Sequence, residues 1–152
     1  MIAGDGELKG ELHQLIDEKK LETVVRLMGF RQDIRELLLI ADLFVLPSLD
    51  EGMPMSLLEA VASRTPVIAT VLGDIPKLIR HEESGLIIPA NDAEALAQAV
   101  RELQVDRQKR ERLPQTALCM LERHYSSERM YKQYEEAVYD RMAGFSANDQ
   151  RK

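Results

Sequence analysis

The stretch that decides the fold is residues 41–59, which reads ADLFVLPSLDEGMPMSLLE. Its apolar start, residues 43–46, predicts a short buried strand that runs into a loop. Pro54 suits the first position of a helix, where a missing N–H costs nothing. Glu51 therefore follows the strand, and Glu59, with seven residues between the two acids, lies inside the helix. Because ligands bind at the carboxyl edge of open parallel sheets, and a helix N-terminus there offers N–H groups, the stretch predicts a site for an anionic, hydroxyl-bearing ligand.

Apolar patterns on either side of this stretch alternate between strand and helix periods. The expected strands cover residues 24–28, 43–46, 67–69 and 86–88, and the expected helices cover 7–20, 34–41, 54–62, 75–79, 93–103 and 106–123. This alternation predicts a parallel, doubly wound α/β sheet. The pair Asn91-Asp92 is expected to offer the N-cap of the helix that follows it. We expect one domain over residues 1–143, which closes with a helix that contains Met130 to Met142, and a frayed tail over 144–152.

Composition excludes several classes of protein. The net charge of −6 argues against general affinity for nucleic acid. No apolar run approaches the ~20 residues needed to cross a bilayer. The scattered histidines have no cysteine pairs beside them, so no metal site is expected. The lone cysteine, Cys119, is expected to be a small buried residue in a protein of the reducing cytoplasm. The cluster Arg107, Arg110 and Arg112 is expected to form a solvated helix face.

The two acids resemble the Glu-x7-Glu signature of retaining GT-B glycosyltransferases, and of glycosyltransferase family 4 (glycosyl transferases group 1) in particular. Other segments resemble this family in the same order along the chain; they are residues 4–8, 25–30, 41–48, 65–76 and 84–89. The resemblance covers nearly the whole chain. It implies a Rossmann-like parallel sheet with helices on both faces, which is the C-terminal, nucleotide-sugar-binding half of a GT-B fold.

The resemblance also implies roles for individual residues. Glu51 would lie by the donor sugar as the catalytic residue, and Glu59 would bind the ribose hydroxyls, because a carboxylate can accept two hydroxyl hydrogens. A backbone cradle for the sugar and diphosphate would comprise Gly52, Met53, Pro54, Met55 and Ser56. Pro54 stands where many relatives have glycine and removes one amide donor. The segment that borders the base would comprise Gly29, Phe30 and Arg31.

Each of these residues also has a purely structural interpretation. Glu51 could be a solvated acid that the helix dipole stabilises, and Glu59 an exposed acid in the middle of a helix. Phe30 could be an ordinary core residue and Arg31 a solvated charge. From the residues alone both interpretations stay open.

The family implies sugar transfer from a nucleotide diphosphate sugar with retention of configuration, in polysaccharide or glycolipid synthesis. It implies no cofactor and no essential metal. Relatives carry an N-terminal acceptor domain, and also the first strand and helix of the C-terminal domain, before the position of Gly4. Neither is expected in this chain. In the Rossmann order that strand is central, so its loss predicts a marginally stable chain. Without an acceptor domain, and without the cations that relatives place on the diphosphate, we expect the chain to be inactive alone. A missing or separately encoded acceptor domain is its expected partner, and peripheral contact with a membrane is compatible with the family.

Two alternatives remain at this point. One is a nucleotide-sugar epimerase of the same GT-B shape, although the catalytic acids and histidine that it needs are not found in this sequence. The other is a non-catalytic nucleotide-binding or interaction module that docks through its last helix.

Overall fold

The computed structural model describes residues 1–125, which fall into two compact units. Unit 1 is Met1–Leu37, and unit 2 begins at Leu38, so the boundary lies within helix α2 (Ile34–Ile40). The last predicted helix and the tail lie outside the described residues. The predicted domain over 1–143 therefore stays a prediction.

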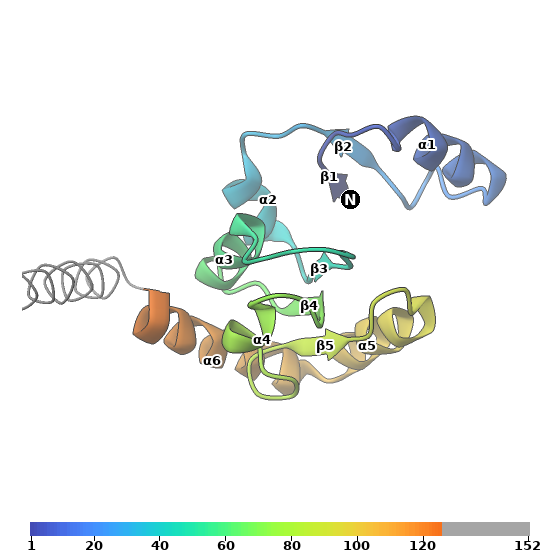
Figure 1. Ribbon diagram of the computed structural model, residues 1–152. Helices are drawn as coiled ribbons and strands as arrows, with labels where there is room; N and C mark the ends of the chain where they lie inside the picture. Colours follow the sequence, from blue (N-terminus) through green and yellow to red (C-terminus); the bar gives the residue numbers. More distant parts are fainter. Residues whose placement is uncertain (126–152) are drawn as a thin grey trace, which may run out of the picture. The chain divides into compact units, whose positions relative to one another are not determined.

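Unit 1 contains the short strands β1 (Ile2–Ala3) and β2 (Leu27–Gly29) and the helix α1 (Lys9–Glu18). The two strands pair in parallel, with Ile2 opposite Leu27 (Figure 1). β2 begins later than the sequence predicts because the preceding residues form a turn, in which the Val25 N–H donates to the Leu21 carbonyl at 2.8 Å. No residue of unit 1 is buried. The strand pair and the helix therefore form without a buried core of their own.

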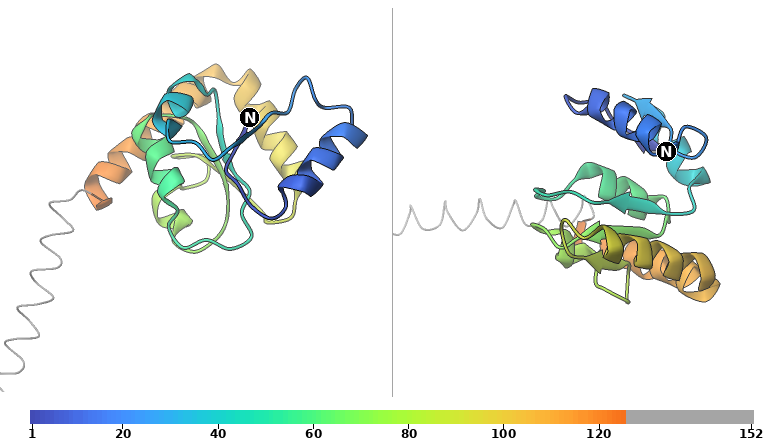
Figure 2. Two further views of the ribbon diagram at one scale, coloured as in Figure 1. Left: turned by 90° about the horizontal axis from the view of Figure 1, so that it is seen from above. Right: turned by 90° about the vertical axis from the view of Figure 1, so that its right-hand side faces the viewer.

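Unit 2 is a three-stranded parallel sheet with helices on both of its sides. The strands are β3 (Phe44–Leu46), β4 (Val67–Thr70) and β5 (Leu86–Ile88), in the order β3-β4-β5. The helices are α3 (Met55–Ala62), α4 (Ile75–Leu78), α5 (Ala93–Val105) and α6 (Arg107–Tyr125). Seen from above in Figure 2, α3 and α4 lie on one side of the strands and α5 lies on the other. The predicted fold class, α/β with a parallel sheet and helices on both faces, is confirmed.

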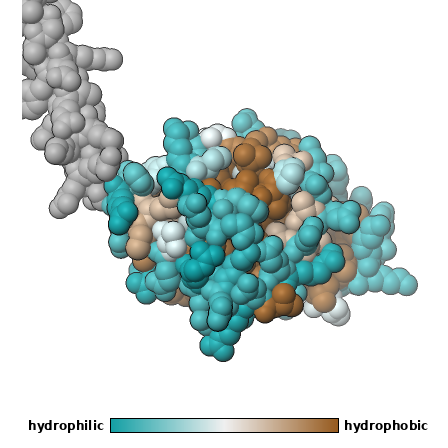
Figure 3. Space-filling view, turned by 90° about the horizontal axis from the view of Figure 1, so that it is seen from below, coloured by the Kyte–Doolittle hydropathy of each residue, from teal (hydrophilic) through white to brown (hydrophobic). Residues whose placement is uncertain are grey.

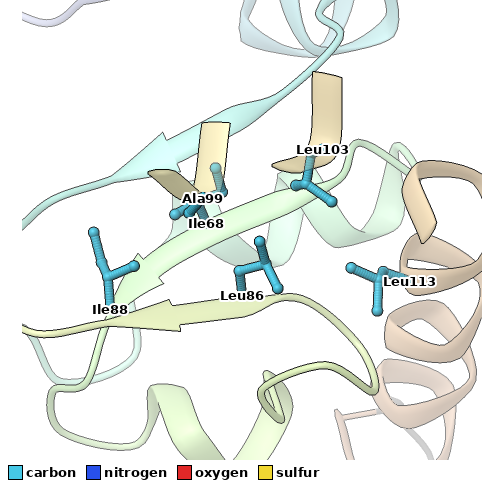
Figure 4. Packing of buried hydrophobic residues seen from close by; sticks show 6 residues of the cluster. All are labelled: Ile68, Leu86, Ile88, Ala99, Leu103 and Leu113. Atoms are coloured by element: carbon cyan, nitrogen blue, oxygen red, sulfur yellow. The ribbon is translucent and has the colours of Figure 1, made fainter. Parts of the chain in front are cut away.

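The core of unit 2 forms around its central strand. All four residues of β4 are buried, which is typical of a parallel strand covered on both faces. Ile68, at its centre, lies opposite Val45 of β3 and Leu86 of β5. Figure 4 shows how side chains from the strands and from the two C-terminal helices meet; they are Ile68, Leu86, Ile88, Ala99, Leu103 and Leu113. Burial of one leucine or isoleucine side chain of this cluster stabilises the fold by about 1.5–3 kcal/mol.

Local details confirm some sequence predictions and correct others. Asp92 caps α5, since its carboxylate accepts a hydrogen bond from the Ala95 N–H at 2.8 Å. Pro54 is the N-cap of α3 and not its first helical residue, because its ψ of 135° is extended. Cys119 is exposed, so the prediction that it is buried was wrong.

The arginine cluster is also not simply a solvated helix face. The Arg110 guanidinium donates to the carbonyls of Leu103 and Gln104 at the end of α5, and the Arg112 guanidinium donates to the Glu82 carbonyl. Two of the three arginines therefore satisfy backbone carbonyls that a helix end or a loop leaves open.

Polar side chains cover most of the surface seen in Figure 3, and the apolar residues visible there form smaller patches between them. Within residues 1–125, no helix is both long enough and apolar enough to cross a membrane.

Candidate functional site

The candidate site lies where the parallel strands of unit 2 end. β3 stops at Leu46, and the chain then forms a loop that carries Glu51 and Gly52 before α3 begins at Met55. Glu51 is half-buried, and its Oε1 accepts a hydrogen bond of 3.0 Å from the Ser48 hydroxyl. That bond leaves the carboxylate with further lone pairs for a ligand hydroxyl.

The start of α3 offers backbone donors beside this carboxylate. No side chain caps the helix at Pro54. Its first backbone hydrogen bond runs from the Leu57 N–H to the Pro54 carbonyl at 3.1 Å. The N–H groups of Met55 and Ser56 precede that bond, and the first N–H groups of a helix have no partner within the helix. These two amides, with the positive end of the helix dipole, can donate to an anion.

Glu59 lies in the second turn of the same helix. Leu57, Ala60 and Val61 are fully buried, whereas Glu59 is exposed. The helical period thus keeps its carboxylate out of the core and free to accept hydroxyl hydrogens. The structure places both predicted acids on one loop-helix segment that follows one strand.

The end of β4 and the loop that follows it restrain the Glu51 loop. The Thr70 hydroxyl donates to the Ser48 carbonyl at 2.8 Å, and the Asp74 N–H donates to the Gly52 carbonyl at 3.0 Å. Gly73 approaches the Glu51 carbonyl so closely that a Cβ on Gly73 would lie 2.1 Å from that oxygen. The neighbouring strand end therefore fixes the loop that carries Glu51.

Sequence reasoning missed Ser48, Thr70 and Gly73 as parts of this site. A signal was present, because Thr70 ends the strand next to β3, and polar or glycine residues at neighbouring strand ends meet at one sheet edge. What the sequence could not give was which strands are neighbours.

The predicted base-binding segment lies in unit 1. Phe30 is 75% exposed, so the interpretation of it as a core residue was wrong. The Arg31 guanidinium donates to both carboxylate oxygens of Asp33. This bond raises the pKa of Arg31 and lowers the pKa of Asp33 from their ordinary values. The role of Gly29, Phe30 and Arg31 in binding a base stays a prediction.

No cluster of three or more histidine, cysteine, aspartate or glutamate residues that could hold a metal ion occurs within residues 1–125. Near the site, Lys77 of α4 is held by Asp74, with 2.7 Å between the Nζ and the Oδ1. The Asp74 carboxylate raises the pKa of this lysine. The groups of unit 2 described above as able to bind a ligand are two carboxylates and the amides at the start of α3.

Comparison with known proteins finds a matching family model, similar sequences and similar solved structures. The family model described as "Glycosyl transferases group 1" matches residues 1–118. The chain is 40% identical over 105 residues to the putative colanic acid biosynthesis glycosyltransferase WcaL of Escherichia coli (strain K12), which covers 64% of this chain and 26% of that protein. It is 30% identical over 140 residues to N-acetyl-alpha-D-glucosaminyl L-malate synthase of Bacillus anthracis, with 92% of this chain and 37% of that protein covered.

A solved structure, Anabaena Alr3699/HepE in complex with UDP-glucose, superimposes with a TM-score of 0.84 at 27% identity. The superposition covers 91% of this chain and 40% of that one. The chain thus spans between about a quarter and two fifths of the length of these three proteins. The similarity extends over most of the present chain but over a minor part of each relative.

Proposed function

Because this chain belongs to the glycosyl transferases group 1 family, we propose that it is the donor-binding part of a retaining, family 4-like glycosyltransferase. The whole protein would transfer a sugar from a nucleotide diphosphate sugar to an acceptor in polysaccharide or glycolipid synthesis. One observation carries this proposal: the half-buried Glu51 and the free amides of α3 follow the same strand end, with Glu59 in the next turn. The family match favours a transferase over the epimerase alternative.

The geometry of unit 2 supports a division of roles. Glu51, the proposed catalytic residue, would contact the donor sugar, while the amides of Met55 and Ser56, with Gly52 and Met53, would meet the sugar and diphosphate. Glu59 would bind the ribose hydroxyls. Charge-assisted bonds of this kind are stronger than neutral ones, so each acid should matter measurably for binding.

In this proposal no cofactor or metal takes up the charge of the leaving diphosphate. Backbone donors fixed at a helix start can stabilise such charge because they need not reorganise during the reaction. Two amides do not neutralise a diphosphate, so we propose that cations from a further segment, together with an acceptor domain, complete the site. The chain alone is then expected to be inactive. Its cytoplasmic location also stays a proposal.

Binding of nucleotides to the chain tests the donor site directly. UDP-glucose and UDP are the first ligands to try, because the solved structure of similar fold contains UDP-glucose, and GDP and ADP serve as comparisons. We expect ligand-observed NMR to detect saturation transfer to the ribose of one nucleotide. Glu59→Ala should weaken that binding about tenfold or more, since it removes a charge-assisted hydrogen bond.

Glu94→Ala is the matched control, because Glu94 is an exposed acid in the first turn of another helix of unit 2. It should change the affinity less than twofold. Equal losses in the two variants would contradict the ribose role of Glu59. No binding to a chain that is demonstrably folded would mean that the donor site does not form without another segment.

A transfer assay tests the second half of the proposal. With a radiolabelled donor we expect no transfer by this chain above the level of its Glu51→Ala variant. Transfer clearly above that level would show that the chain needs no acceptor domain.

A further inference from the structure

The Glu51 carboxylate is linked to the buried end of β4 through two hydroxyl groups. The Ser48 hydroxyl donates to Glu51 Oε1 at 3.0 Å, and the Thr70 hydroxyl donates to the Ser48 carbonyl at 2.8 Å. Thr70 is only 1% exposed. Its hydroxyl also lies 3.4 Å from the Leu46 carbonyl, but one hydroxyl has one hydrogen, and the shorter contact takes it.

A second restraint acts on the backbone of the same loop. Gly73 has a φ of +47°, and a Cβ there would lie 2.1 Å from the Glu51 carbonyl oxygen and 2.6 Å from that of Gly52. Even if the backbone angle were tolerated, a side chain would force the Glu51 loop to move. The Asp74 N–H, which donates to the Gly52 carbonyl, holds the loop from the same side.

From these contacts we infer that Thr70, Ser48 and Gly73 are positioning residues that set the orientation of the Glu51 carboxylate toward the donor sugar. The inference rests on the proposed function only for the identity of that sugar ligand. The Ser48 hydroxyl restrains the Glu51 side chain, the Thr70 hydroxyl restrains the backbone of Ser48, and Gly73 leaves room for the backbone of Glu51. None of the three residues needs to touch the ligand.

A purely structural role makes a different prediction. If Thr70 only fills space, then valine, which has the same shape, should replace it better than serine does. If Thr70 positions Glu51 through its hydroxyl, serine should replace it better than valine. The two substitutions therefore separate packing from positioning.

The experiment uses the full chain labelled with 13C and 15N. We expect Ser48→Ala and Thr70→Val to shift the side-chain carboxyl resonance of Glu51 and to raise the picosecond–nanosecond mobility of the Gly52 and Met53 amides. Thr70→Ser keeps the hydroxyl and should leave these signals as they are in the wild type. Gly73→Ala should shift the Glu51 and Gly52 amides.

Thr65 offers a matched control in the same unit. It is 3% exposed, and its hydroxyl donates to the Leu38 carbonyl at 3.0 Å, so it is also a buried threonine bonded to a carbonyl. It precedes β4, however, whereas Thr70 is the last residue of that strand. Thr65→Val should affect stability without changing the Glu51 signals. If Thr70→Val leaves the Glu51 signals unchanged, or if Thr70→Ser disturbs them more than valine does, the inference is wrong.

Should Thr70→Val fail to fold, Ser48→Ala carries the same test, because Ser48 is half-buried in a loop. Unchanged Glu51 signals in that variant also overturn the inference. These readouts need no ligand, so they stand apart from any failure of the proposed function.

Where the chain binds nucleotides, a second readout applies. The positioning variants should weaken UDP-glucose about two- to tenfold while leaving UDP unchanged, since Glu51 faces the sugar. Equal losses for both ligands would show a general disturbance of the site and would contradict positioning toward the sugar.

Discussion

The two compact units differ in the burial of their apolar side chains. In unit 2, Leu103 and Leu113 are fully buried, whereas in unit 1 Leu8 and Leu15 are 63% and 48% exposed. Unit 1 also contains a largely apolar cavity of about 470 Å³, lined in part by Leu12. A pair of short strands is marginally stable without a core. The comparison shows that the hydrophobic core and both acids of the Glu51–Glu59 segment lie in unit 2, while no residue of unit 1 is buried.

The same substitution in two helices should give the largest contrast. Leu103→Ala in α5 opens a cavity in the core and should lower the free energy of unfolding by about 2–5 kcal/mol. Leu15→Ala in α1, where the side chain is already half-exposed, should cost less than about 1 kcal/mol. Urea denaturation followed by circular dichroism measures both. Similar losses would mean that unit 1 has a core equivalent to that of unit 2.

Hydrogen exchange extends the comparison to the backbone. We expect the β4 amides to exchange roughly a hundredfold more slowly, or more, than those of Ile2 and Gly4, because β4 is paired on both sides and buried. The Ile2 N–H donates to the Arg26 carbonyl and the Gly4 N–H to the Gly29 carbonyl, both at 2.8 Å. These two bonds, however, belong to a strand pair in which no residue is buried. Equal protection by NMR would remove the distinction between the units.

Glycine substitutions should have opposite signs in the two units. A Cβ on Gly85 would lie 2.7 Å from a methyl carbon of Ile79, so Gly85→Ala should destabilise unit 2 by about 1–3 kcal/mol. Gly10 in α1 has no atom within 4 Å of such a Cβ, and Gly10→Ala should stabilise by up to about 1 kcal/mol. Thermal melts of both variants check this. A stabilised Gly85→Ala would show that the loop can move away.

The smallest effect concerns ion pairs. The Lys109 ammonium donates hydrogen bonds to both Glu102 and Glu82, and these bonds raise the pKa of Lys109. The bond from Lys109 also lowers the pKa of Glu82 below its ordinary value of 4.5. A lowered carboxyl pKa contributes stability above pH 4.5 that is lost as the pH falls through the folded value. Lys109→Met should therefore cost about 0.5–1 kcal/mol at pH 7 and less below pH 4.

Unit 1 supplies the control for this ion pair. Lys9 pairs with Asp5 at 3.3 Å between two exposed side chains, so Lys9→Met should produce no measurable change at any pH. Denaturation curves at pH 7 and pH 3.5 compare the two lysines. A loss of stability in Lys109→Met that does not vary with pH would mean that packing of the lysine stem, and not its charge, is responsible.

The sequence predicted the elements of unit 2 well because their patterns are local. β5 has the predicted bounds, and β4 extends one residue farther than predicted, to Thr70. Predictions were less accurate where the same residues are compatible with more than one backbone conformation. Val24 forms part of a turn although a strand was predicted to begin there, and Pro54 caps a helix that it was expected to begin.

Predictions of burial and of side-chain partners also failed where residues far away in the sequence determine the surroundings of a side chain. Cys119 lies on a helical face whose exposure depends on how α6 packs. Arg110 was expected in solvent, but it lies next to the end of α5, whose carbonyls it satisfies. Nothing in residues 107–112 alone indicates that neighbour.

By itself, the sequence determined the alternation of strands and helices, the parallel sheet and the place of Glu51 and Glu59 on a strand end and a helix. Hydrophobic periodicity and the spacing of two acids are local properties, so they can be read along the chain. Only the tertiary structure decided that the core lies within unit 2 and that Thr70 and Gly73 hold the Glu51 loop. Those contacts join residues about 20 positions apart, and they exist only because β3 and β4 pair side by side.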